Sequence, residues 1–187
     1  MSNFGEFFLS VACFVLFAWG AVEYLLTAIS DYRLALRRGV AGAFLAWVPL
    51  GNIWLHGRLA DQYQQVMAGR RTKRAATMVT LTILGVAVLS LAIMILSSVG
   101  DYLSHSRLEP GSLLGLVVGI LLAIAGCGLC LARKIVGYVT DYNIYHSCKP
   151  DRASTFVVSS IFFSFLKPFY RIGCSGYDEG FAVRAQN

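Results

Sequence analysis

Long runs of apolar residues alternate with shorter polar connections along the chain. Residues 7–29 are apolar apart from Glu23 and a few small polar side chains, and residues 77–99 and 112–132 carry no charged side chain. About twenty helical residues cover the roughly 30 Å hydrocarbon core of a bilayer. Each of the three runs therefore predicts a transmembrane helix, and the third helix is expected to continue to about residue 147.

A fourth apolar run, residues 153–172, is shorter than the others. It contains Lys167, Pro168 and Arg171 near its end, so it predicts either a fourth crossing or a segment that re-enters the membrane. With the fourth run counted as a crossing, the fold class predicted is an all-α membrane protein with four transmembrane helices. No soluble domain interrupts the runs, so residues 1–187 are expected to form a single integral membrane domain.

The segment between the first two runs, residues 40–67, is predicted to be an interfacial helical hairpin rather than a kinked crossing. Pro49 lacks the amide hydrogen that a helix interior needs, so a short helix over 40–50 should turn at Pro49, Gly51 and Asn52. Over residues 53–67, apolar side chains recur at helical spacing opposite a polar face. The apolar face comprises Leu55, Leu59, Tyr63 and Val66, and the polar face comprises Arg58, Asp61, Gln62 and Gln65. Trp47 and Trp54 should lie at headgroup depth.

Composition supports a membrane protein. The chain is 57% hydrophobic and only 14% charged, whereas ordinary soluble domains are roughly 25% charged. One water-soluble core of this size is not expected to bury so much apolar surface, so the hydrocarbon of a bilayer is the expected solvent.

Basic residues are distributed unevenly between the connections. The connection 30–76 contains Arg33, Arg37, Arg38, Arg58, Arg70, Arg71, Lys73 and Arg74, whereas the connection 100–111 contains only Arg107. Because basic residues stay on the cytoplasmic side, the N-terminus is predicted to face outward and the hairpin to face the cytoplasm. The same residues should attract anionic lipid headgroups. Nucleic-acid binding is not expected, because no folded binding module accompanies the charge.

The sequences that follow the first and third runs resemble each other. Ile-Ser-Asp-Tyr occupies residues 29–32 and Val-Thr-Asp-Tyr occupies residues 139–142, and each is followed by a hydrophobic segment with a late proline. Internal repeats are common in transporter folds, but the identity is a single dipeptide. A degenerate duplication and a chance similarity are both left open.

Glu23 is the main candidate functional residue, since an ionisable group within a membrane helix is by default a functional hypothesis. It would pair with a basic residue, carry a proton or reach for the interface. Lys167 is its candidate partner only if the last segment folds back to the cytoplasmic side. The other candidates lie in the hairpin: Trp47, Pro49, Gly51, Asn52, Trp54, Arg58 and Asp61.

Small residues recur every four positions along the third run, at Gly111, Gly115, Gly119 and Ala123. This spacing allows close approach of another helix, and packing within the chain is favoured over packing with a second copy or a partner.

Cysteines and histidines give weaker signals. Cys127 and Cys130 form a lone Cys-x-x-Cys, which is interpreted as packing rather than as a redox pair or half of a metal site. His56 and His146 should lie near the cytoplasmic face, but neither lies within a hydrophobic run, so no haem, metal or other cofactor is expected.

Residues 45–64 carry a resemblance to a known group. Leu45-Ala46-Trp47-Val48-Pro49-Leu50-Gly51-Asn52-x-Trp54, then Gly57 and Asp61-Gln62-Tyr63-Gln64, is similar to a run in an uncharacterised family of small multi-spanning bacterial membrane proteins. The resemblance implies a bacterial cytoplasmic membrane location and a four-segment fold, and supplies no activity. The chain departs from the family pattern after Gly180.

The sequence thus predicts a non-enzymatic integral membrane protein, an accessory or regulatory subunit that acts through protein or lipid partners. A small oligomeric transporter or channel, with Glu23 and the 49–52 break lining its path, is the first alternative. A membrane redox or metal-binding protein is the second. No phosphate loop, nucleophile elbow or zinc-protease helix occurs, which favours a protein without catalytic activity.

Overall fold

The computed structural model describes the backbone of residues 2–104 and 110–177 and the side chains of residues 7–100 and 113–177. This part of the chain is helical, without strands. Its α-helices are α1 (Ser2–Arg37), α2 (Pro49–Ala68), α3 (Arg74–Ser104), α4 (Pro110–Cys148), α5 (Ala153–Phe162) and α6 (Lys167–Cys174). Three short 3-10 helices join them: η1 (Ala43–Trp47), η2 (Pro150–Arg152) and η3 (Ser164–Leu166).

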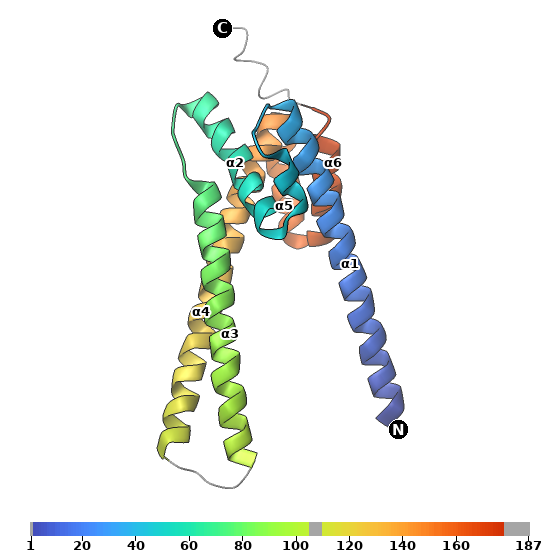
Figure 1. Ribbon diagram of the computed structural model, residues 1–187. Coiled ribbons are helices and arrows are strands. Elements are labelled where there is room, and N and C mark those ends of the chain that lie inside the picture. Colours follow the sequence, from blue (N-terminus) through green and yellow to red (C-terminus); the bar gives the residue numbers. More distant parts are fainter. Residues whose placement is uncertain (1, 105–109, 178–187) are drawn as a thin grey trace.

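Three of these helices, α1, α3 and α4, are long and apolar enough to cross a membrane, as the first three runs predict. They extend from a cap formed by α2, α5 and α6 together with the C-terminal ends of α1 and α4 (Figure 1). The parts of these helices outside the cap form two legs. In one leg α3 and α4 pack side by side, whereas the N-terminal half of α1 forms the other leg and lies apart from them (Figure 1). The apolar side chains on that half are exposed, and Phe17 reaches 78%.

Glycines on α4 allow the close approach of α3. A Cβ atom built on Gly115 would lie 2.9 Å from Val99 Cγ2, and one built on Gly119 would lie 2.8 Å from Leu96 Cδ2. Gly126, which the four-residue ladder does not include, makes the same kind of contact with Leu89 at 2.7 Å. The packing at these positions is therefore within the chain. Ala123 is half-buried, and Gly111 lies outside the residues whose side chains are described.

The hydrophobic core lies in the cap, where the ends of α1 and α4 meet α2 and α6. Its largest fully buried apolar side chains are Leu34, Leu55, Leu59 and Tyr145. Because α1 and α4 enter this core only with their C-terminal ends, most of their apolar surface is left for another apolar environment.

A fourth crossing is not confirmed. Residues 153–172 form α5, η3 and the start of α6, and α5 has only 10 residues. At 1.5 Å per residue such a helix covers about 15 Å, half the hydrocarbon thickness. The chain turns at Phe163, whose backbone leaves helical geometry, and α6 returns to pack against α1.

The hairpin differs in detail from its prediction. The expected short helix is the 3-10 helix η1, and the turn lies at Val48, so Pro49 begins α2 instead of interrupting a helix. Proline is well tolerated at the first helical position because that amide has no partner within the helix. Gly51 lets α2 approach η1, since a Cβ there would lie 2.7 Å from Leu45 O. Asn52 secures the contact by donating Nδ2 to Ala46 O at 3.0 Å.

The predicted polar face of α2 is wrong at Asp61, which is only 6% exposed. The Asp61 carboxylate accepts hydrogen bonds from the hydroxyl of Thr72 and from the backbone N–H groups of Arg74 and Ala75. These amides open α3, where the first N–H groups have no partner within the helix. Asp61 is therefore buried because it caps a neighbouring helix.

Candidate functional site

Four helices bring buried ionisable side chains together where the cap meets the legs. Asp31 comes from α1, His56 from α2, Asp141 from α4, and Lys167 and Arg171 from α6. Asp141 accepts hydrogen bonds from Arg171 Nη2 at 2.5 Å and pairs with Lys167 Nζ at 2.7 Å. Asp31 Oδ2 lies 3.8 Å from Arg171 Nη1. We call these five residues the ion cluster.

His56 lies between the two carboxylates of the ion cluster. Its Nδ1 is 3.3 Å from Asp31 Oδ2 and its Nε2 is 3.0 Å from Asp141 Oδ1. Arg171 Nη2 is also 2.9 Å from His56 Nε2. His56 Nδ1 lies near Asp31 but makes no hydrogen bond to any described residue, whereas Nε2 lies within hydrogen-bond distance of Asp141 and Arg171.

Two carboxylates and two basic side chains balance one another in this cluster when His56 is neutral. Arg171, Asp31 and Asp141 are almost completely buried, and a buried charge is tolerated only when it is paired and hydrogen-bonded. Burial alone would lower the pKa of Arg171, but the carboxylates of Asp141 and Asp31 outweigh it and hold that pKa above its ordinary value. The guanidinium is accordingly a permanent cation that ties α6 to α1 and α4.

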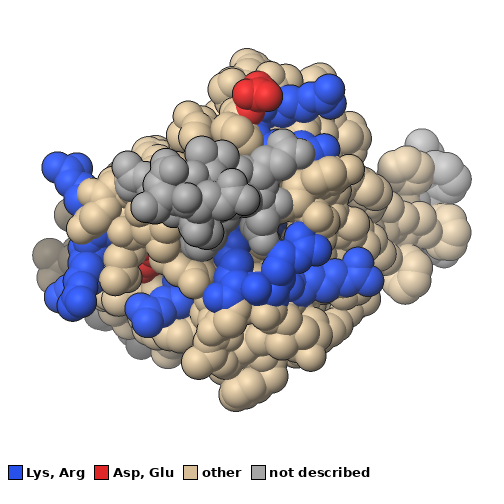
Figure 2. All heavy atoms as spheres, turned by 90° about the horizontal axis from the view of Figure 1, so that it is seen from above, with Lys and Arg blue, Asp and Glu red and all other residues tan. Residues whose placement is uncertain are grey.

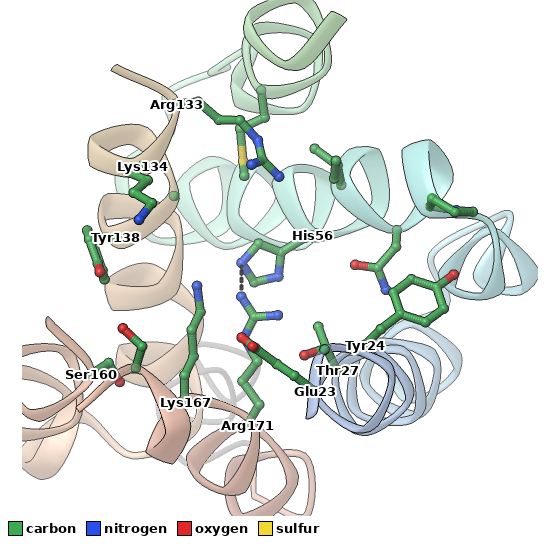
Figure 3. Close-up of a pocket in the computed structure, with 17 residues that line it drawn as sticks. Glu23, Tyr24, Thr27, His56, Arg133, Lys134, Tyr138, Ser160, Lys167 and Arg171 are labelled. Carbon is green, nitrogen blue, oxygen red and sulfur yellow. Dashed lines mark hydrogen bonds between the residues drawn. The ribbon is translucent and has the colours of Figure 1, made fainter. Parts of the chain in front are cut away.

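A cavity of about 580 Å³ opens beside the ion cluster. It is lined by residues of α1, α2, α4 and α6, and Figure 3 shows their side chains converging from these helices. The basic lining residues are Arg133, Lys134, Lys167 and Arg171, and Glu23 is the acidic one. The polar lining residues also include Tyr24, Thr27, Asn52, His56, Tyr138, Ser160 and Ser164.

Three charged groups of this cavity have no ion-pair partner among the residues that the structure describes: Glu23, Arg133 and Lys134. Four polar atoms of lining residues are buried without a hydrogen-bond partner in the described part of the chain: Tyr24 Oη, His56 Nδ1, Arg133 Nε and Arg171 Nε. Arg133 and Lys134 follow the uncharged run 112–132 directly. The cavity thus lies where the apolar part of α4 ends.

Several predicted site residues meet here and others do not. Glu23, Pro49 and Asn52 line this cavity. Lys167, the candidate partner of Glu23, does return to it, but its ion pair is with Asp141. Trp47 lies outside it, 6.2 Å from the ring of Tyr32.

Other hairpin candidates line a second cavity of about 700 Å³ on the far side of α2. Trp54, Arg58 and Asp61 contribute to it, together with Arg71 and Lys73 from the connection to α3. Seen from above the cap, Lys and Arg side chains spread over much of the surface and acidic ones are few (Figure 2). The cap therefore presents a basic face.

The cysteine and histidine candidates separate. Cys127 is exposed, whereas Cys130 faces Gly85, with Sγ 3.5 Å from a Cβ built there. His146 Nδ1 is 2.6 Å from Tyr63 Oη and does not belong to the ion cluster. No group of metal-binding side chains is found among the described residues.

Sequence reasoning did not select Asp31, Asp141 or Arg171 as site residues. A signal was present, because Asp31 and Asp141 are the acidic residues of the two Asp-Tyr dipeptides that resemble each other. The structure brings these two carboxylates to the same histidine and the same arginine. Both aspartates therefore belong to one cluster in the folded chain.

The chain matches no family model, no curated protein and no solved structure. Its class is thus given by its architecture: an all-helical protein with three helices able to cross a membrane. The similarity of residues 45–64 to small bacterial membrane proteins stays a prediction.

Proposed function

We propose that the protein is a non-enzymatic integral membrane protein that binds the phosphate headgroup of a membrane lipid in the cavity beside the ion cluster. In this proposal α1, α3 and α4 cross a bacterial cytoplasmic membrane and the cap faces the cytoplasm, as the basic connection 30–76 favours. Its role is accessory or regulatory, through the lipid that it holds.

The observation that carries the proposal is the pair Arg133 and Lys134. These side chains come directly after the apolar run of α4 and line the cavity without an ion partner in the described chain. The end of an apolar run is the depth at which lipid phosphates lie. Long basic side chains near the end of a membrane helix extend to the interface, and a phosphate oxygen there accepts strong charge-assisted hydrogen bonds from them.

The divergence of the helices supports a lipid rather than a small soluble ligand. Apolar side chains of residues 7–22 on α1 are exposed, and so are those on much of α4. A bilayer leaves no void beside such surfaces, so hydrocarbon must fill the space between the two legs. Acyl chains in this space would place their own headgroup at the cavity.

The ion cluster supports the cavity structurally. Arg171 pairs with Asp31 of α1 and with Asp141 of α4, and these buried pairs hold α6 against both helices.

Native mass spectrometry of the protein in mild detergent, titrated with phosphatidylglycerol, tests the proposal. The variant Arg133→Gln/Lys134→Gln removes both unpaired cations. At about 1 kcal/mol per basic residue near a lipid headgroup, it should lose about 2 kcal/mol, or roughly 30-fold in affinity. The control Arg33→Gln/Arg70→Gln removes two exposed basic residues that do not line the cavity. Equal binding by both variants would overturn the proposal.

A second candidate is transport through the same cavity, because Glu23, Pro49 and Asn52 all line it. Irregular backbone is tolerated at membrane depth where it lines a water-filled path, and the break at Val48 lies next to these residues. Ion or solute flux into vesicles that contain the protein, abolished by Glu23→Gln, would favour this function over lipid binding alone.

A further inference from the structure

The charged side chains of the cavity are sorted by helix. Glu23, Tyr24 and Thr27 enter from α1, whereas Arg133 and Lys134 enter from α4 (Figure 3). The two sets face each other across the opening, and the basic Lys167 and Arg171 enter from α6 beside Glu23, so Glu23 is the acidic residue of a mainly basic lining. A ligand with only negative charge would complement the basic side chains but leave the Glu23 carboxylate without an opposite charge.

Among the described residues Glu23 has no basic partner, because the nearby basic residues are already engaged. Arg171 bonds to Asp141 at 2.5 Å and lies 3.8 Å from Asp31. Lys167 lies 2.7 Å from Asp141. Both are held by carboxylates of the ion cluster, which leaves the Glu23 carboxylate to face the cavity.

We propose that the headgroup bound in this cavity carries a primary ammonium as well as a phosphate, with the phosphate against Arg133 and Lys134 and the ammonium against Glu23. This inference rests on the proposed function, since it names the class of lipid for the same site. Phosphatidylethanolamine has this chemistry.

The Glu23 carboxylate fits a primary ammonium. Such a group has three N–H donors and no acceptor. The carboxylate, which has no ion-pair partner among the described residues, accepts one or two of these N–H groups and supplies the opposite charge. A trimethylated ammonium has no N–H to donate, and a glycerol headgroup brings no positive charge. Glu23 is thereby a specificity-determining residue for the amine.

The size of the cavity agrees with this assignment. Pockets for small ligands commonly enclose about 300–1,000 Å³, and this one has about 580 Å³. That volume holds a phosphate with a short aminoalkyl arm and leaves the acyl chains outside, along α1 and α4.

The test is competition between lipids with identical acyl chains, measured by native mass spectrometry on the full chain. Phosphatidylethanolamine, phosphatidylcholine and phosphatidylglycerol are compared on the wild type, on Glu23→Gln and on the control Asp151→Asn, which changes an exposed carboxylate outside the cavity. A charge-assisted hydrogen bond of ordinary strength corresponds to roughly tenfold in affinity. We expect the wild type and the control to prefer phosphatidylethanolamine by about tenfold. Glu23→Gln should lose that preference and bind phosphatidylglycerol more tightly.

The outcomes separate this inference from the proposed function. If the wild type binds all three lipids equally and loses all three in Arg133→Gln/Lys134→Gln, the amine assignment is wrong and phosphate binding stands. If the wild type binds none of them, the proposed function itself is wrong. A preference that survives in Glu23→Gln would overturn the role of Glu23. Should Glu23→Gln not fold, the ratio between phosphatidylethanolamine and phosphatidylcholine on the wild type still decides the assignment.

Discussion

Asp141→Asn is the substitution that most directly perturbs the ion cluster. The wild-type carboxylate lies 2.5 Å from Arg171 Nη2, 2.7 Å from Lys167 Nζ and 3.0 Å from His56 Nε2. The amide keeps the shape but removes the negative charge. Arg171 is 6% exposed, so it cannot turn to water and would keep only Asp31, at 3.8 Å, while Lys167 would lose its ion pair.

The magnitude follows from this burial. Breaking a buried ion pair by removing one partner costs about 3–5 kcal/mol. For a chain of this length each kcal/mol lowers the melting temperature by about 2–4 °C, so the fall should be about 6–20 °C. The matched control is Asp151→Asn, an exposed aspartate, which should stay within about 0.5 kcal/mol of the wild type.

Thermal unfolding of the purified protein in mild detergent, followed by circular dichroism, measures these shifts. The double variant Asp141→Asn/Lys167→Met restores charge balance, because Asp31 and Arg171 remain as one pair. It should recover part of the lost stability, although Lys167 is 25% exposed and therefore contributes less than Arg171. An Asp141→Asn protein that melts with the wild type would refute the view that this cluster holds the cap together.

Other positions give independent tests. Gly57→Ala should lower stability by about 1–3 kcal/mol in thermal unfolding, because its Cβ would lie 2.4 Å from Ala75 Cα. The control Gly128→Ala has open space around it and should be neutral or slightly stabilising. Asp61→Ala removes the cap of α3 and should cost about 1–2 kcal/mol, seen as faster hydrogen exchange at residues 74–77. Burial raises the pKa of Tyr63, and the neighbouring Tyr142 raises it further. The positive charge of Arg38 lowers this pKa but does not cancel the rise. The neutral phenol therefore stabilises the fold below about pH 10, and this contribution is lost as pH rises through the folded-state pKa. In Tyr63→Phe the alkaline loss of stability should be shallower, and an unchanged slope would exclude the effect.

The three helices that are long and apolar enough to cross a membrane could be predicted, because length and uncharged composition are enough to recognise them. The last segment was harder, since it is equally apolar but only 10 residues are helical before the turn at Phe163. Lys167 and Arg171 are the reason that it returns, because both end at Asp141. That partnership joins residues far apart in sequence and leaves no local pattern.

The candidate site could be predicted in part. Glu23 and Asn52 were selected by local rules and do line the cavity. Asp61 was placed on the wrong face because helical periodicity does not reveal that another helix begins beside it. The ion cluster requires four helices to converge, so the Asp-Tyr dipeptides marked two of its residues without indicating what they would bind.

A crystal structure of the full chain grown in a lipidic phase that contains phosphatidylethanolamine tests the central claim most directly. The proposal predicts phosphate density within hydrogen-bond distance of Arg133 or Lys134, with acyl chains beside the exposed half of α1. It would be contradicted by a structure in which these lipids are present but the cavity holds no phosphate and Arg133 pairs with Glu23 instead.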